Sequence, residues 1–339
     1  MGYGERVDTV VGTFSRLLHM RGASHDTTKD LTPYVDRPLA ELLPAPPGAP
    51  VVRRRAPLVS GARVTETLSW KSAHEPLCEK YERRHHHEYR KNQIAWSRWM
   101  HPRGGQRKSL LLYVHGWLEP GSWVEEATLM PSWYKNLGVD VAHVQLPFHG
   151  RRGPRGQLFH GEWFWTADLV RSLEAVRQAV MDVRSAIAHF RAEGYEEIGV
   201  TGLSLGGSIT MVLACVDPAP DYIVPMIAHL KLAAAVEEAS ILWRMKSDLD
   251  RLGFDQTARK ELFSHLAIST AKPLLAPEKQ LWVAAEEDAY LRADLVRQQA
   301  DEWGHPEVLW IRGGHMTFPL QIDRINAAMK RMPKLAAPL

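Results

Sequence analysis

Short apolar segments that alternate with helix-like segments constrain the fold of this chain more than any other feature of its sequence. The run from Leu110 to Val114 is apolar without interruption, which is typical of a strand buried on both faces. A long amphipathic helix is expected over 168–193. Further strands are expected within 138–147, 198–204, 222–235, 280–288 and 307–314. This alternation predicts an α/β protein with a mostly parallel central sheet flanked by helices.

The first 61 residues are expected to form an N-terminal extension. Residues 5–20 predict an amphipathic helix, and its apolar face carries Val7, Val10, Val11, Phe14, Leu17 and Leu18. We favour a helix that docks on its own domain, and weak association with a membrane surface through residues 5–20 is the alternative. The Pro-rich segment 33–60 is expected to be an extended connector with no helix or strand of its own.

The remaining residues are expected to form one core interrupted by a cap. Strands should begin at about residue 62, and segments 63–72 and 89–100 predict two neighbouring strands. Residues 236–272 look helical throughout and are interpreted as a helical cap insertion. The core then comprises residues 62–235 and 273–339.

Composition argues against several classes of function. The net charge of +3 is too small for a nucleic-acid-binding surface. Cys78 and Cys215 form no CxxC pair, so neither a zinc site nor a redox dithiol is expected. The consecutive histidines 85–87 would point to opposite faces of a strand, and they favour a solvated segment over a metal site. With no signal peptide and no apolar stretch of about 18 residues, a cytoplasmic location is expected.

The strongest motif is Gly202-Leu203-Ser204-Leu205-Gly206, which matches G-x-S-x-G. It follows an apolar strand and precedes a segment of small residues that predicts a helix. In a strand–turn–helix of this kind the serine hydroxyl projects from a sharp turn, and side chains two residues away on either side would collide. The motif therefore predicts that Ser204 is a nucleophile.

A serine nucleophile needs a base and an acid that follow it in the chain. His315 comes after Ser204 and directly follows the last predicted strand, and it is preceded by two glycines. Asp288 lies three residues beyond the strand that ends at Ala285, so we favour it as the acid, with Glu287 as the closest rival. For the oxyanion hole, the backbone N–H groups of Leu205 and Trp117 are the expected donors.

The motifs HGW (115–117), LPFHGRRGP (146–154), GLSLGG (202–207), AAEED (284–288) and GGH (313–315) resemble, in this order, the alpha/beta-hydrolase superfamily. The resemblance covers about residues 108–332 and implies the alpha/beta-hydrolase fold. One departure is Ala285, where relatives often have glycine. LPFHGRR and GLSLGG more narrowly resemble a poorly characterised subfamily of alpha/beta-hydrolase-domain proteins that is linked to lipid deacylation.

We therefore expect a serine esterase that needs no cofactor and acts on a hydrophobic or lipid-like small-molecule ester. An acyltransferase or a thioesterase would use the same triad, and a non-catalytic binding protein could keep the same fold. His149 and Arg152 follow a predicted strand and are candidates for binding an anionic substrate group. Trp163 belongs to an aromatic cluster and is a candidate for the wall of a hydrophobic pocket. A structural role for these three residues is the alternative.

Overall fold

The structure, a computed structural model, describes residues 2–18, 22, 25–119 and 123–335. Within these residues, the strands form one nine-stranded sheet in the order β1-β2-β3-β5-β4-β6-β7-β8-β9. The strands are β1 (Arg53–Ser60), β2 (Arg63–Lys71), β3 (Ile94–Pro102), β4 (Ser109–Val114), β5 (Asp140–Val144), β6 (Glu197–Leu203), β7 (Tyr222–Met226), β8 (Leu281–Ala285) and β9 (Glu307–Ile311). Strands β4 to β9 pair in parallel, and β1 to β3 add an antiparallel edge. The predicted fold class is confirmed.

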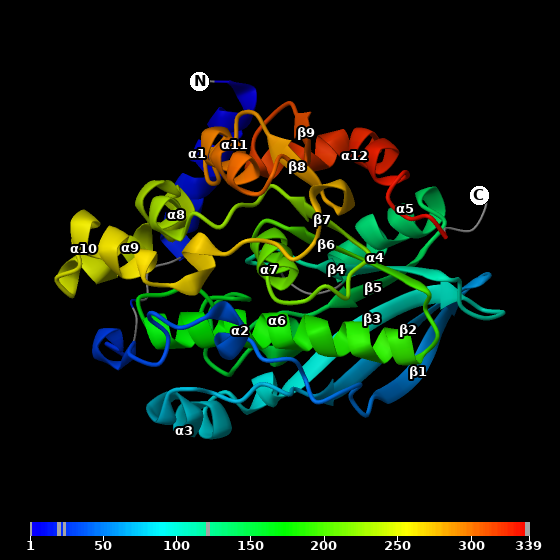
Figure 1. Cartoon of the computed structure of the whole chain (residues 1–339), viewed down its shortest axis with the longest axis horizontal. Coiled ribbons are helices and arrows are strands. Elements are labelled where there is room, and N and C mark those ends of the chain that lie inside the picture. Colours follow the sequence, from blue (N-terminus) through cyan, green and yellow to red (C-terminus); the bar gives the residue numbers. More distant parts are fainter. Residues whose placement is uncertain (1, 19–21, 23–24, 120–122, 336–339) are drawn as a thin grey trace.

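Helices cover both faces of this sheet (Figure 1). The α-helices are α1 (Tyr3–Leu18), α2 (Leu39–Leu42), α3 (Glu79–His87), α4 (Trp123–Ala127), α5 (Leu129–Asn136), α6 (Leu169–Ala192), α7 (Leu205–Ala214), α8 (Leu232–Glu238), α9 (Trp243–Arg251), α10 (Gln256–Ser264), α11 (Ala293–Glu302) and α12 (Ile322–Met329). The apolar run of β4 shows no alternation because both faces of this strand are buried. Leu110 and Leu112 pack into the core that contains α6 and α7, whereas Leu111 and Tyr113 pack into the core on the side of α5 and α12.

Helix α6 matches the predicted segment 168–193 within one residue at each end. Asp168 caps its first turn by accepting a hydrogen bond from the backbone N–H of Arg171. The sequence predicted an amphipathic helix, yet nearly all of α6 is buried. The reason is that the segment before β1 covers its outer face: Arg177 donates to the backbone oxygen of Leu42, and Tyr34 donates to Glu174.

The prediction that residues 33–60 lack regular structure is wrong in two places. The short helix α2 lies within the segment, and residues 53–60 form β1 at the antiparallel edge of the sheet. All eight residues of β1 are exposed, so the strand has no buried face that would leave an apolar pattern in the sequence. As predicted, β2 and β3 are neighbours, but α3 lies between them in the chain. The division into extension, core and cap remains a prediction. Residues 53–60, which were assigned to the extension, form strand β1 of the sheet.

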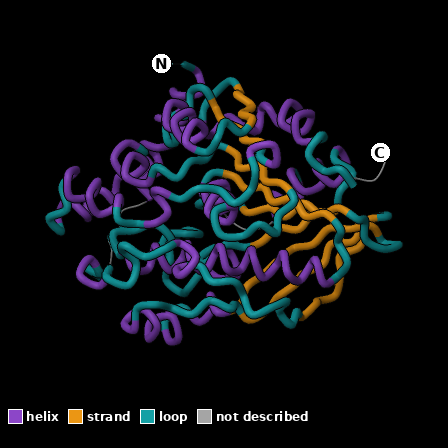
Figure 2. Tube along the Cα trace, in the orientation of Figure 1, coloured by secondary structure: helices purple, strands orange, loops and turns teal. Residues whose placement is uncertain are grey.

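Helix α1 packs against the 3₁₀ segments η4 (Ser240–Leu242) and η7 (His315–Gln321). This packing agrees with the favoured interpretation of a helix that docks on its own domain. Tyr3, Val10 and Phe14 of the same helix remain exposed. The side chains of Leu17 and Leu18 lie outside the described residues. Helices α8 to α10, within and beside the predicted cap, gather at one end of the strands (Figure 2). In the described part of the chain, helix length and apolarity fall short of what a bilayer-spanning segment needs.

Candidate active site

Ser204 occupies the sharp turn between β6 and α7. Its φ of 53° and ψ of −112° place a non-glycine residue in a strained backbone conformation that is typical of functional turns. Glycine is required on both sides because the backbone passes too closely for a side chain. A Cβ atom at Gly202 would lie 2.1 Å from the oxygen of Gly206, and one at Gly206 would lie 2.0 Å from the oxygen of Val114. The turn therefore has the geometry of a nucleophile elbow.

His315 connects this serine to a carboxylate. Its Nε2 atom lies 2.8 Å from Ser204 Oγ, and its Nδ1 atom lies 2.8 Å from Asp288 Oδ2. Because a carboxylate only accepts hydrogen bonds, Nδ1 carries the proton and Nε2 is free to accept from the serine hydroxyl. Burial lowers the pKa of His315, but the negative charge and hydrogen bond of Asp288, together with the negative charge of Asp8, outweigh this effect, so the pKa is raised. This row of groups can activate a hydroxyl.

The two candidate acids have different partners. Asp288 is buried, and its Oδ1 accepts hydrogen bonds of 2.8 Å from the backbone N–H groups of Tyr290 and Leu291, so the carboxylate has a fixed orientation toward His315. Glu287 instead accepts a hydrogen bond of 2.7 Å from the backbone N–H of Gly4 in α1. The structure thus brings Asp288, the favoured acid, to His315.

The loop after β4 lies beside the elbow, as the sequence predicted for the oxyanion loop. A Cβ atom at Gly116 would be 3.8 Å from Ser204 Cβ, so the absence of a side chain keeps this space open. His115 fixes the loop: its Nδ1–H donates to the oxygen of Gly116 at 2.7 Å, and its Nε2 accepts from the N–H of Leu146 at 2.9 Å. Burial lowers the pKa of His115 to about 4, which keeps the ring in this neutral state.

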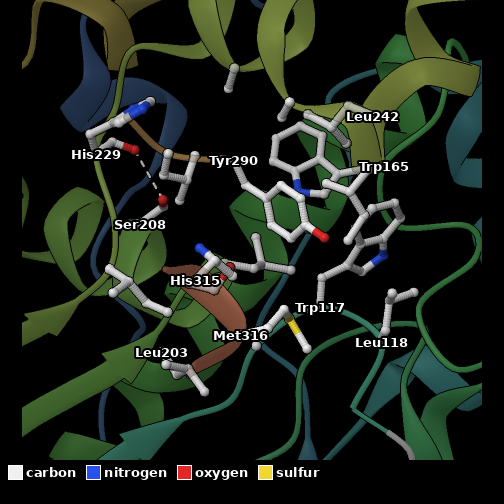
Figure 3. Close-up of a pocket in the computed structure, with 18 of the residues that line it drawn as sticks. Trp117, Leu118, Trp165, Leu203, Ser208, His229, Leu242, Tyr290, His315 and Met316 are labelled. Carbon is white, nitrogen blue, oxygen red and sulfur yellow. Dashed lines mark hydrogen bonds between the residues drawn. The ribbon is translucent and has the colours of Figure 1, made fainter. Parts of the chain in front are cut away.

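A cavity of about 410 Å³ opens at Ser204 and His315, within the range of typical ligand pockets. In the view of Figure 3, Trp117 and Trp165 lie on one side of the cavity and His229 and Ser208 on the other. Residues of α8, α9, α10 and the segments between them supply much of the apolar wall, through Leu232, Val236, Ala239, Leu242, Met245 and Phe263. Leu205, the second expected oxyanion residue, also lines it.

Three candidate substrate residues lie elsewhere, and their predicted role is corrected. Arg152 is fully buried, forms an ion pair of 2.7 Å with Asp182 and donates to two backbone oxygens. His149 is buried and its Nδ1–H donates to the oxygen of Pro147. Trp163 packs on Tyr89, outside the residues that line the cavity. Arg152 belongs to a loop and pairs with Asp182, a buried acid on α6. The sequence alone does not indicate which basic residue pairs with a buried acid.

The three consecutive histidines also differ from expectation, because they belong to helix α3 and not to a strand. Of these, His86 and His87 are solvent-exposed, but His85 is buried against Tyr81 and His74. The surrounding segment is therefore only partly solvated.

Sequence reasoning missed Asp8, a buried carboxylate that contacts the loop of His315. One signal was available. Asp8 lies among the apolar residues of the predicted helix 5–20, and Gly4 and Gly12 lie one turn before it and one turn after it. An acidic residue flanked by glycines on the packing face of a helix indicates that this face lies close to backbone N–H groups of a neighbouring segment.

The chain is similar to known proteins in both sequence and structure. A sequence model of the family described as "Alpha/beta hydrolase domain containing 18" matches residues 127–275, which include the elbow and end before Asp288. Two uncharacterized proteins of Mycobacterium tuberculosis, Rv2627c and MT2702, are each 26% identical over 239 residues. The match covers 67% of this chain and 55% of each relative, so the chain spans about half the length of the curated relatives it matches.

Solved structures share the fold at low sequence identity. An acetyl xylan esterase from Paenibacillus sp. R4 is 13% identical with a TM-score of 0.60, and the match covers 84% of this chain and 89% of that one. Acetyl xylan esterase 1 from Thermoanaerobacterium sp. JW/SL YS485 is also 13% identical, with a TM-score of 0.58 and coverage of 90% and 98%. The sheet order, the elbow between β6 and α7 and these neighbours lead to one conclusion: the chain has the alpha/beta-hydrolase fold, and its residues 127–275 are similar to a family of alpha/beta-hydrolase-domain proteins.

Proposed function

We propose that this protein is a serine hydrolase that cleaves a carboxylic ester through an acyl-enzyme on Ser204. The observation that carries the proposal is the continuous hydrogen-bonded row from Ser204 Oγ through His315 to Asp288, with 2.8 Å at each step. Ser204 and His315 line an apolar cavity at the carboxyl ends of the parallel strands, which is where α/β proteins bind their ligands.

The chemistry follows from the direction of these hydrogen bonds. His315 Nε2 takes the proton of Ser204 as the serine oxygen attacks the ester carbonyl, and Asp288 stabilises the resulting imidazolium. The backbone N–H groups of Leu205 and Trp117 are proposed to hold the oxyanion. The alcohol leaves with the proton from His315, and a water molecule, deprotonated by the same histidine, releases the acid.

Turnover of p-nitrophenyl esters tests this function. Ser204→Ala should lower kcat by about 10⁶-fold, as loss of the nucleophile does in serine hydrolases. Ser60→Ala, a change of the same chemistry at an exposed position of β1, should leave kcat unchanged. Equal turnover by wild type and Ser204→Ala would refute the proposal. Product analysis with water, alcohol, amine and thiol acceptors then separates hydrolysis from acyl transfer.

The substrate is proposed to carry a hydrophobic or lipid-like acyl group, because cap residues of apolar character surround the reactive serine. Burial of each added CH₂ contributes about 0.8 kcal/mol, which corresponds to about a fourfold gain in kcat/KM until the cavity is filled. Leu242→Trp should shift the optimum to shorter chains, since Leu242 lines the cavity. Leu274→Trp, at a residue that is 58% exposed, is the matched control. A maximum at acetyl esters would contradict a long hydrophobic acyl group.

A further inference from the structure

The carboxylate of Asp8 joins the two loops that carry the proposed acid and base. Its Oδ2 accepts hydrogen bonds from the backbone N–H of His315 at 2.7 Å and of Ala289, the residue after Asp288, at 3.1 Å. Its Oδ1 accepts from the N–H of Met316 at 2.8 Å. Asp8 is 0% exposed, so one buried carboxylate accepts hydrogen bonds from three backbone donors.

Helix α1 approaches these loops too closely for the contact to be incidental. A Cβ atom at Gly4 would lie 2.0 Å from the backbone nitrogen of Gly314, and one at Gly314 would lie 2.4 Å from Asp8 Oδ2. From the acid loop, Tyr290 Oη donates to the backbone oxygen of Asp8 at 2.7 Å. Figure 1 shows α1 beside α11, next to β8 and β9, the two strands that lead into these loops.

We propose that Asp8 is a positioning residue of the active site, and that docking of α1 holds the acid loop and the base loop in their reactive register. This inference rests on the proposed function. Asp8 does not touch Ser204 in this arrangement; it acts through the backbone of His315. A displacement of about 1 Å in a reacting group can lower the rate by about 10²-fold, so a loosened loop is expected to reduce kcat more than it changes KM.

The charges around His315 agree with this role. Burial lowers the pKa of His315, whereas Asp288 and, more weakly, Asp8 raise it. The ring of Tyr290, with its centroid 5.1 Å from that of the imidazole, and the hydroxyl of Ser204 also face His315. Loss of the Asp8 charge should therefore move the acidic limb of the kcat/KM profile to lower pH.

The test compares Asp8→Asn with Asp323→Asn in the full-length protein. An asparagine in either orientation turns its NH₂ group toward at least one backbone N–H, so at least one hydrogen bond is lost. We expect kcat and the rate of fluorophosphonate labelling to fall by about 10²-fold, with KM changed less than threefold. Asp323, exposed at the start of α12, should tolerate the same change without effect.

Hydrogen exchange provides a readout that does not depend on catalysis. The amides of Ala289, His315 and Met316 should be protected in the wild type and exchange faster in Asp8→Asn. If wild type neither labels nor turns over esters but these amides still lose protection in Asp8→Asn, the proposed function fails while the docking geometry stands.

Gly4→Ala tests the same contact from the steric side and replaces Asp8→Asn if that variant does not fold. The added methyl group collides with the backbone at Gly314, so α1 should be displaced while the Asp8 carboxylate is retained. We expect the same loss of kcat and of amide protection. Folded variants with wild-type labelling rates and a wild-type pH profile would overturn the proposal.

Discussion

Replacement of the proposed acid by its amide, Asp288→Asn, tests how the directions of the hydrogen bonds in the site determine its activity. Asp288 Oδ1 accepts two backbone N–H bonds of 2.8 Å, from Tyr290 and Leu291. In asparagine the carbonyl oxygen must occupy that position, because an NH₂ group cannot accept. The NH₂ group then faces His315 Nδ1, which has to accept a hydrogen bond in place of donating one.

This reversal selects the wrong tautomer of His315. When Nδ1 accepts, Nε2 carries the proton and cannot remove the proton of Ser204. Loss of the acid's function in a triad of this kind lowers kcat by about 10⁴-fold, equivalent to about 5.4 kcal/mol of transition-state stabilisation. The geometry of the elbow and the cavity stays intact, so KM should change little.

Steady-state hydrolysis of p-nitrophenyl esters measures the effect, with circular dichroism to verify folding. Glu287→Gln is the matched control, because its amide oxygen can still accept the hydrogen bond from Gly4 N–H. We expect kcat of this control to stay within threefold of wild type. If Asp288→Asn kept kcat within tenfold of wild type, or if only Glu287→Gln abolished turnover, the assignment of the acid would be refuted.

Three further predictions concern protonation, stability and surface binding. Because catalysis needs neutral His315 and its pKa is raised, kcat/KM should fall as pH drops through a midpoint above 6.5, and a midpoint below 6.5 would contradict the charge argument. Arg152→Ala leaves the buried carboxylate of Asp182 without its positively charged partner and should lower the free energy of unfolding by about 3–5 kcal/mol in urea titrations. The KM of that variant should be unchanged, and a large rise would restore a substrate-binding role. Weak membrane association through residues 5–20 is also proposed: exposed Val10 and Phe14 should support co-sedimentation with phosphatidylcholine vesicles, and equal sedimentation of Val10→Glu/Phe14→Glu would rule this out.

The elements that the sequence predicted well are those in which burial leaves a local pattern. The run Leu110–Val114 is apolar because both faces of β4 contact core. The elbow glycines are dictated by close backbone approaches, of Gly202 to Gly206 within the turn and of Gly206 to Val114 at the end of β4, and both glycines fall within one five-residue motif. His315 and Asp288 could be selected because each follows an apolar strand, and parallel strands bring their carboxyl ends to one edge of the sheet.

The failures share a physical cause, since each depends on contacts between distant segments. Arg152 looked like an anion-binding residue because its partner Asp182 lies 30 residues away on α6. The exposed strand β1 has no buried face and contains Pro57, which edge strands tolerate. Asp8 gains its importance from loops nearly 300 residues later, and no spacing rule connects them.

Covalent labelling tests the central claim most directly. The protein is incubated with a fluorophosphonate, digested and analysed by mass spectrometry, with Ser204→Ala as the control. The hydrogen-bonded row of Ser204, His315 and Asp288 predicts one adduct on the peptide that contains Ser204, absent from the variant. A folded wild-type protein that forms no adduct, or one labelled at another residue, would contradict Ser204 as the nucleophile.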